Sequence, residues 1–397
     1  SQFLGHRRMA TSKEMTAGPA LPLIFNFTLP LLFGNLLQQT YSLVDAAIVG
    51  KFLGINALAS VGASTSVVFL ILGFCNGCCG GFGIPVAQKF GARDYSTMRS
   101  YVSVSLQLAV VMSVVIAIFT SIYCADILKM MRTPENIFEG AYAYLLVTFI
   151  GIPCTFFYNL LSSIIRALGD SKTPFYFLVL ATVLNIILDL FCILVLGWGV
   201  MGAAFATSLS CLAGATVTMG YLLFYARDTR LHSLRPGRKR ILFFFHDIGM
   251  QCKIGSSALL GELTMAILLF IGNQVFMRHL GDDGVGAFGV SCYYLPFVFM
   301  IGNAIAQSAQ PIISYNFGTG STERVRSALR VSVFAALVCG VISTAAFILF
   351  PELLVGLFLR IDNTAARIAI EGFPYYGTGF IHCPLVDGTR THRTAFE

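Results

Sequence analysis

The chain alternates between long apolar stretches and short polar connections. About 20 apolar residues span the hydrocarbon core of a bilayer, so an uncharged stretch of that length indicates a membrane-spanning helix. Charged residues are absent from 52–88, 100–125, 140–165, 190–226, 284–322 and 331–351. Divided at turn signals, the pattern predicts ten helices, at 21–50, 57–88, 101–124, 140–165, 174–196, 200–226, 251–278, 285–316, 329–350 and 366–382.

Composition supports an all-α integral membrane protein. Of the 397 residues, 56% are hydrophobic and only 11% are charged, whereas soluble domains are about one quarter charged. This excludes an ordinary soluble enzyme. The net charge of +7 is attributed to membrane orientation, so we expect contact with the lipid bilayer and no nucleic-acid partner. Most of the 11 cysteines lie in apolar runs, which indicates packing rather than a disulfide framework or a metal site.

The basic residues predict the orientation. With the N-terminus in the cytoplasm, 18 of the 26 Lys and Arg residues fall in cytoplasmic segments, six in outer connections and two in the tail. Because cytoplasmic loops are enriched in Lys and Arg, we expect a multi-pass protein of the inner (plasma) membrane with a cytoplasmic N-terminus. The predicted division is a cytoplasmic segment at 1–20, a first lobe at 21–226, a basic linker at 227–250, a second lobe at 251–382 and a polar tail at 383–397.

The two lobes share an internal repeat. A shift of 227 positions aligns Phe90-Gly91 with Phe317-Gly318 and Arg99-Ser100 with Arg326-Ser327. Chance apolar similarity does not match Gly, Asn, Arg and Ser this often at one offset. Further matches are Leu32 with Leu259, Gly34 with Gly261, Gly62 with Gly289, Ser64 with Ser291 and Asn76 with Asn303.

The offset covers six helices, an even number, so both copies enter the membrane in the same direction. Parallel repeats of this kind build transporters whose binding cavity lies between the halves. A channel or a membrane enzyme has less need of this symmetry. The sequence also contains no His-Glu-x-x-His metal motif and no repeated acidic rings of the channel type.

Three acidic residues fall inside predicted spans: Asp45, Asp189 and Glu262. A buried carboxylate costs about 2.5–3.5 kcal/mol on insertion scales and normally faces a partner or a cavity. Counting from the outer helix ends at 1.5 Å per residue places Asp45, Asp189 and Thr207 at similar depths in the outer half. Asn185 precedes Asp189 by four residues and shares its helix face.

These four residues predict a coupling-cation site in the first lobe. Oxygen ligands suit Na⁺, and two adjacent carboxyl groups equally hold a proton. The alternative is that Asp45 and Asp189 are hydrogen-bonded structural groups. Glu262 is either a residue of the substrate cavity that meets cationic compounds or an interhelical polar contact. Pro30 should kink the first helix and could act as a hinge, although proline is also tolerated in membrane helices for packing.

Several motifs stand out along the chain: Leu29-Pro30 with Val44-Asp45, Val49-Gly50-Lys51-Phe52-Leu53-Gly54 with Ala57-Leu58-Ala59, Arg166-Ala167-Leu168-Gly169-Asp170-Ser171-Lys172-Thr173-Pro174, Leu184-Asn185-Ile186-Ile187-Leu188-Asp189 and Gly202-Ala203-Ala204-Phe205-Ala206-Thr207. These motifs resemble those of the multidrug and toxic compound extrusion transporters, over about residues 20–375. The resemblance implies two bundles of six helices, antiport of Na⁺ or H⁺, and export of bulky organic cations or other amphiphiles. It also implies that Asp45, Asn185, Asp189 and Thr207 form the first-lobe cation site and associates Glu262 with the second lobe.

The C-terminal part departs from the family pattern. A design of six plus six helices requires an eleventh and a twelfth helix, but the sequence after Phe380 is polar and ends at Glu397. We therefore expect an incomplete second lobe with a truncated or frame-shifted tail. The alternative is a naturally short family member.

The main hypothesis is a cation-coupled antiporter that exports amphiphilic or cationic small molecules by alternating access. We expect a monomer without cofactor or enzymatic activity, whose coupling ion is Na⁺ or H⁺. An alternative is a flippase for lipid-linked precursors with the same architecture. Such a flippase needs a cationic cavity for phosphate, and the first two predicted helices carry no Lys or Arg inside the membrane.

Overall fold

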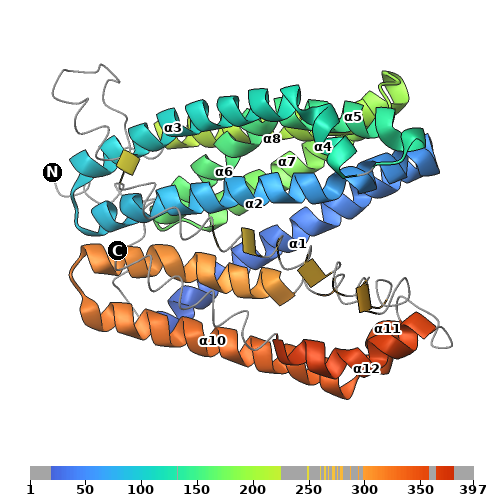
Figure 1. The fold of residues 1–397 in the computed structure, drawn as a ribbon. Helices are drawn as coiled ribbons and strands as arrows, with labels where there is room; N and C mark the ends of the chain where they lie inside the picture. Colours follow the sequence, from blue (N-terminus) through green and yellow to red (C-terminus); the bar gives the residue numbers. More distant parts are fainter. Residues whose placement is uncertain are drawn as a thin grey trace.

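The computed structural model describes residues 19–131, 133–224, 298–356 and 364–379, together with scattered positions between 248 and 294. These parts of the chain are helical and contain no strand (Figure 1), which confirms the predicted all-α class. The helices are α1 (Ala20–Leu53), α2 (Ile55–Gly91), α3 (Tyr95–Ile122), α4 (Cys124–Met130), α5 (Glu135–Ile150), α6 (Ile152–Ala167), α7 (Lys172–Leu190), the π-helix η1 (Phe191–Val195), α8 (Val200–Phe224), α10 (Thr322–Leu349), α11 (Pro351–Gly356) and α12 (Thr364–Thr378). Residues 298–318 form a further helix, called here the 298–318 helix.

Six of the described helices are long and apolar enough to cross a membrane, or seven if α5 and α6 are one span. The span predicted at 140–165 is in fact this pair, whose axes differ by 47°. The break lies at Gly151, and Pro153 in the first turn of α6 fits a helix start because proline has no N–H to donate. The span predicted at 251–278 lies almost entirely outside the described residues, so the predicted number of ten stays a prediction.

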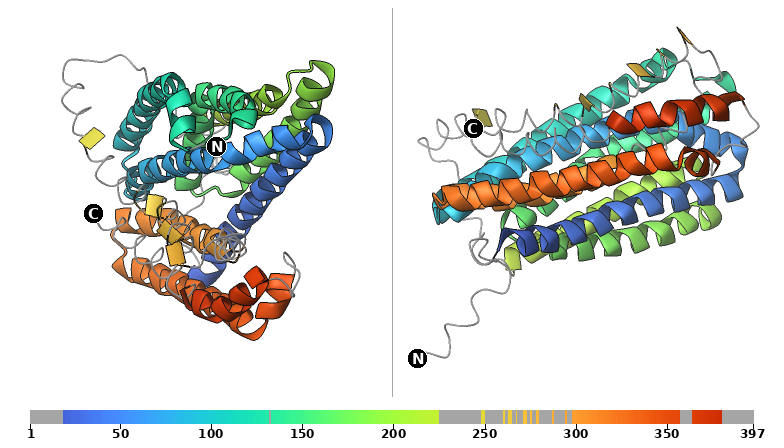
Figure 2. Two further views of the ribbon diagram at one scale, coloured as in Figure 1. Left: turned by 45° about the vertical axis from the view of Figure 1, so that its right-hand side comes forward. Right: turned by 90° about the horizontal axis from the view of Figure 1, so that it is seen from below.

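The helices form two lobes (Figures 1 and 2). One contains α1 to α8, and the other contains the 298–318 helix with α10, α11 and α12. Helix α1 packs against α7 and α2 of its own lobe and also contacts α10 of the other. We call the end of the bundle where α2 gives way to α3 the basic end, because Lys89, Arg93, Arg99, Lys172, Arg324 and Arg326 lie at the helix ends there.

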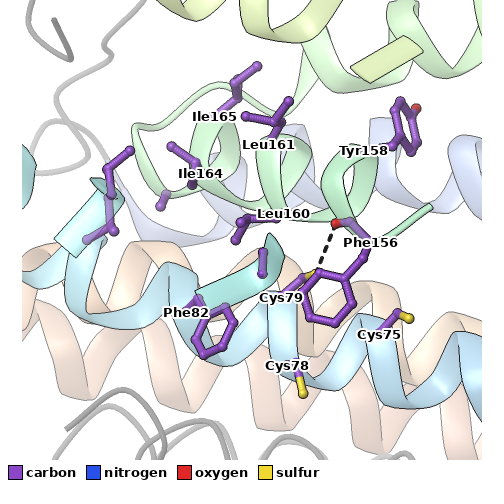
Figure 3. Packing of buried hydrophobic residues seen from close by; sticks show 14 of the residues in the cluster. Cys75, Cys78, Cys79, Phe82, Phe156, Tyr158, Leu160, Leu161, Ile164 and Ile165 are labelled. Carbon is purple, nitrogen blue, oxygen red and sulfur yellow. Dashed lines mark hydrogen bonds between the residues drawn. The ribbon is translucent and has the colours of Figure 1, made fainter. Parts of the chain in front are cut away.

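The core of the first lobe is built around α6. Ten of its 16 residues are buried, because α2, α3 and α8 all pack against it. Cys75 and Cys79 of α2 lie against Phe156 and Leu160 of α6 (Figure 3). The Cys79 thiol donates a hydrogen bond of 3.6 Å to the Phe156 carbonyl oxygen, so this cysteine packs as a small side chain between two closely spaced helices.

The structure repeats itself with the offset found in the sequence. Helices α3 and α10 each have 28 residues, and both of their ends differ by 227 positions. Helices α4 and α11 also begin 227 residues apart. Local backbone geometry follows the same rule before α3 and α10, where Arg93 (φ 57°) and Gly320 (φ 77°) both adopt the left-handed conformation.

Candidate cation site in the first lobe

Two carboxyl groups meet inside the first lobe. Asp45 lies on α1 and is 8% exposed, and Asp189 lies near the end of α7 and is fully buried. Helix α1 packs along α7, and this brings the two carboxyl groups close enough to interact. Asp45 and Asp189, both predicted from the sequence as site residues, therefore lie close together in the structure.

The backbone changes character directly after Asp189. Helix α7 ends at Leu190 and continues as the π-helix η1, in which the Leu196 N–H bonds the Phe191 carbonyl oxygen at 3.1 Å. A π-turn holds one more residue than an α-turn, so side chains on either side of it no longer follow one helical register. Such turns occur frequently at functional sites.

Asn185 and Thr207 adjoin the carboxyl pair. The Asn185 Nδ2 group donates a hydrogen bond of 3.2 Å to Thr207 Oγ1, and that hydroxyl donates to the Ala203 carbonyl oxygen at 3.1 Å. Asn185 is one turn before Asp189 on α7, while Thr207 comes from α8, which packs along α7. The hydrogen bond fixes the amide so that its oxygen remains available.

Four buried oxygen atoms of this group have no donor among the described residues: Asp45 Oδ1, Asn185 Oδ1 and both carboxyl oxygens of Asp189. Leaving buried polar groups unpaired is costly, and native structures usually satisfy them with water, a proton or an ion. Carboxylate and amide oxygens are the ligands that hard cations prefer, and a pair of carboxyl groups can also share one proton. The residues therefore fit either Na⁺ or H⁺ as a transported ion.

Comparison with known proteins identifies the family of the chain. The MatE family model matches residues 30–191 and 258–380, which together make up more than half of the chain. The chain belongs to the MatE family. Members of this family are multi-pass membrane transporters, so this MatE protein is a transporter and not an enzyme.

Similar proteins share most of the chain. The probable multidrug resistance protein YoeA of Bacillus subtilis is 28% identical over 377 residues, covering 90% of this chain and 78% of its own length. The multidrug export protein MepA of Staphylococcus aureus is 21% identical, with 95% and 83% covered. A crystal structure of a MATE protein in complex with MaD3S matches with a TM-score of 0.81 and 25% identity, covering 96% of this chain and 84% of that one.

Two tyrosines near the carboxyl pair of this MatE transporter were missed by the sequence reasoning. Tyr144 of α5 packs on the apolar cluster around Val49 and Ile193 and lies close to both carboxyl groups. Tyr41 lies one turn before Asp45 on α1 and close to Tyr144. The spacing of Tyr41 from Asp45 is a usable signal because side chains four residues apart share a helix face. Tyr144 comes from another span, and no local pattern identifies it.

Two further site residues are predicted from the sequence of the MatE protein, Pro30 and Glu262. Pro30 lies inside α1, which runs as one helix from Ala20 to Leu53. Glu262 lies outside the described residues, so its assignment to the substrate cavity stays a prediction. The same holds for most of the predicted linker at 227–250 and for the tail at 383–397.

Proposed function

We propose that this MatE transporter is a cation-coupled antiporter that exports bulky amphiphilic or cationic organic compounds, driven by inward movement of Na⁺ or H⁺. The observation that carries the coupling is the buried carboxyl pair of Asp45 and Asp189, in which Asp45 Oδ1 and both Asp189 oxygens have no donor among the described residues. If the two residues had only a structural role, no interaction would offset the free-energy cost of burying these oxygens.

The class of exported compound is inferred from relatives. YoeA is a probable multidrug resistance protein and MepA a multidrug export protein by name. The similarity to each covers at least 90% of this chain. We infer organic compounds of drug-like size as substrates, because the relatives named for drug export align with nearly the whole chain.

The orientation follows from charge. Placing the basic end in the cytoplasm agrees with the enrichment of Lys and Arg in cytoplasmic loops. The two lobes touch at this end, and the orientation therefore places their contact on the cytoplasmic side. A cation then reaches Asp45 and Asp189 from outside, and the substrate leaves in the same direction.

Coupling requires that the cation and the substrate oppose each other's binding. Neutralising the carboxyl pair removes the repulsion between α1 and α7 at that point and changes how the two helices pack. Pro30, 15 residues before Asp45, leaves one backbone hydrogen bond of α1 unmade. We propose that α1 bends at this point when the site is occupied, which transmits cation binding to the lobe interface.

The test uses purified full-length protein in liposomes with a fluorescent organic cation, with Na⁺ and proton gradients imposed separately. Export driven by one gradient identifies the coupling ion, and Asp45→Asn should abolish it. Asp126→Asn is the matched control, because Asp126 is an exposed acid on α4. Gradient-driven export by Asp45→Asn at the parental rate would contradict the proposal. Movement of a labelled lipid-linked precursor without organic-cation transport would point to a flippase.

A further inference from the structure

The two lobes approach one another at backbone level near the basic end. Helix α2 ends at Gly91, and the 298–318 helix ends at Gly318. A Cβ atom at Gly91 would overlap the Tyr315 carbonyl oxygen, and a Cβ atom at Gly318 would overlap the Gln88 carbonyl oxygen. Only glycine fits either position with the lobes in this arrangement, since neither carbonyl group belongs to a side chain that can rotate away.

The contact is reciprocal. The repeat offset of 227 relates Gly91 to Gly318 and also relates Gln88 to Tyr315. Gly91 packs on Tyr315 and Gly318 packs on Gln88, so the repeat converts each contact into the other. This is the pattern of an isologous, two-fold interface, here formed between two halves of one chain. The lobes meet at this point on their own pseudo-symmetry axis.

Apolar side chains surround the glycine contact. Phe90 and Tyr315 pack edge to face with ring centroids 5.3 Å apart. Ile312 and Ile313 are each 1% exposed and belong to the same apolar cluster as Phe82 of α2. An apolar contact of this kind excludes water and ions. A transporter needs such a seal at its closed end, because ions would otherwise leak down the coupling gradient.

Two hydrogen bonds join the lobes deeper in the bundle. The hydroxyl groups of Thr28 and Ser308 lie 2.6 Å apart, and the Gln310 side chain donates a bond of 3.2 Å to the Gly80 carbonyl oxygen. Both are single bonds between groups that water can also satisfy. Separating the lobes here exchanges these bonds for bonds to water at a small net cost.

We propose that Gly91 and Gly318 form the gate that closes the transport pathway at the basic end and must part in every cycle. This rests on the proposed alternating-access function and adds the residues at which the lobes seal. Any larger residue at either glycine wedges the lobes apart and shifts the equilibrium toward the state open at the basic end.

Gate closure can be measured without measuring transport. Thr28→Cys with Ser308→Cys places two thiols where hydroxyl groups now touch, so oxidation forms a disulfide only when the lobes are closed. Cross-linked peptides are identified by mass spectrometry in the full-length protein. Each single cysteine variant controls for reaction with native cysteines.

Gly91→Ala and Gly318→Ala are then introduced into the cysteine pair. We expect each to lower the cross-linking yield about tenfold, because overpacking is relieved only by separation of the lobes. Gly220→Ala on α8 is the control, since a Cβ at Gly220 meets nothing within 4 Å and α8 packs on helices of the first lobe. Undiminished cross-linking in both gate variants would overturn the proposal. A variant that fails to fold is recognised by gel filtration, and the test then rests on the disulfide itself.

The disulfide gives the second test. Oxidation of the cysteine pair should stop transport, and a reductant should restore it, while the single variants transport in both conditions. Transport by the fully cross-linked protein would show that the lobes need not part here and would also overturn the gate. If the parental protein exports no organic cation, the proposed function has failed, whereas the cross-linking yields of the glycine variants still decide the gate.

Discussion

Arg93 and Gly320 occupy the same left-handed turn in the two repeats, with φ angles of 57° and 77°. Each lies two residues before the first residue of the following helix, α3 or α10. The left-handed conformation costs a residue with a Cβ roughly 1–2 kcal/mol. The repeat has kept the turn while its residue changed, so the geometry of the turn and not the side chain is what both lobes require.

This relationship predicts that replacing glycine by alanine changes the free energy of unfolding in opposite directions at two positions. Gly320→Ala should lower the free energy of unfolding by about 1 kcal/mol, because alanine is strained at this φ. Gly220→Ala should raise it by about 0.5–1 kcal/mol, because Gly220 is helical and a Cβ there meets nothing within 4 Å. Thermal unfolding of both variants in the same detergent measures the difference. Equal shifts would show that backbone strain at Gly320 does not govern stability.

A second prediction concerns Asp94, which caps α3 in its connection to α2. Its carboxylate accepts a hydrogen bond of 3.2 Å from the Thr97 N–H. Hydrogen bonding to Thr97 holds the pKa of the Asp94 carboxyl below its ordinary value, and Lys89 at 3.9 Å acts in the same direction. Both side chains of this ion pair are about 40% exposed, so the pair itself adds little stability.

The sign of the pH effect follows from the lowered pKa. The charged cap adds stability above the unfolded pKa of about 3.9 and loses it as the pH falls through the folded value. Asp94→Ala should cost about 0.5–2 kcal/mol at neutral pH and less in acid. Asp94→Asn keeps a capping oxygen without the titration, so its stability relative to the parent should not fall further in acid. The measurement is the free energy of unfolding of the three proteins from pH 3 to pH 7. A loss of stability in Asp94→Ala that does not change with pH would refute the role of the charged Asp94 cap.

A third prediction tests the hydrogen bond between Asn185 and Thr207. Thr207→Val keeps the shape of the side chain but removes the acceptor for the Asn185 amide. The amide is then free to turn its oxygen away from the carboxyl pair, and we expect the cation concentration for half-maximal export to rise about tenfold. Thr207→Ser retains a hydroxyl and should stay within about twofold of the parent. If both variants require the same cation concentration, the hydroxyl does not orient the site.

Part of the candidate site could be predicted from the sequence, because the spacing of residues along a helix determines which side chains share a face. Asn185 and Asp189 are four residues apart, and the depth count placed Asp45 and Thr207 at a similar level. Tyr144 could not be found in this way, since it comes from α5, a different span from those of Asp45 and Asp189, and this span bends between α5 and α6. That bend was missed although Gly151 and Pro153 stand together in the sequence, because proline is common in membrane helices that do not break.

The bend itself gives the last prediction. A Cβ atom at Gly151 would lie 2.7 Å from the Cβ of Ser208 and overlap its hydroxyl, and Ser208 adjoins Thr207 of the cation site. Gly151→Ala should therefore push α8 away from the break, destabilise the protein by about 1–3 kcal/mol and impair export. Ser208→Gly removes the opposing Cβ, and alone it should cost about 0.5–1 kcal/mol for glycine in a helix.

The two changes should compensate. In the double variant the new Cβ at position 151 fills space vacated by Ser208, so its stability should exceed the value expected from adding the single losses by at least about 1 kcal/mol. Thermal unfolding and export are measured for all four proteins, and export should recover together with stability. Additive losses would mean that the Gly151 contact does not set the position of α8. Recovered stability without recovered export would mean that the bend serves the fold and leaves the cation site unaffected.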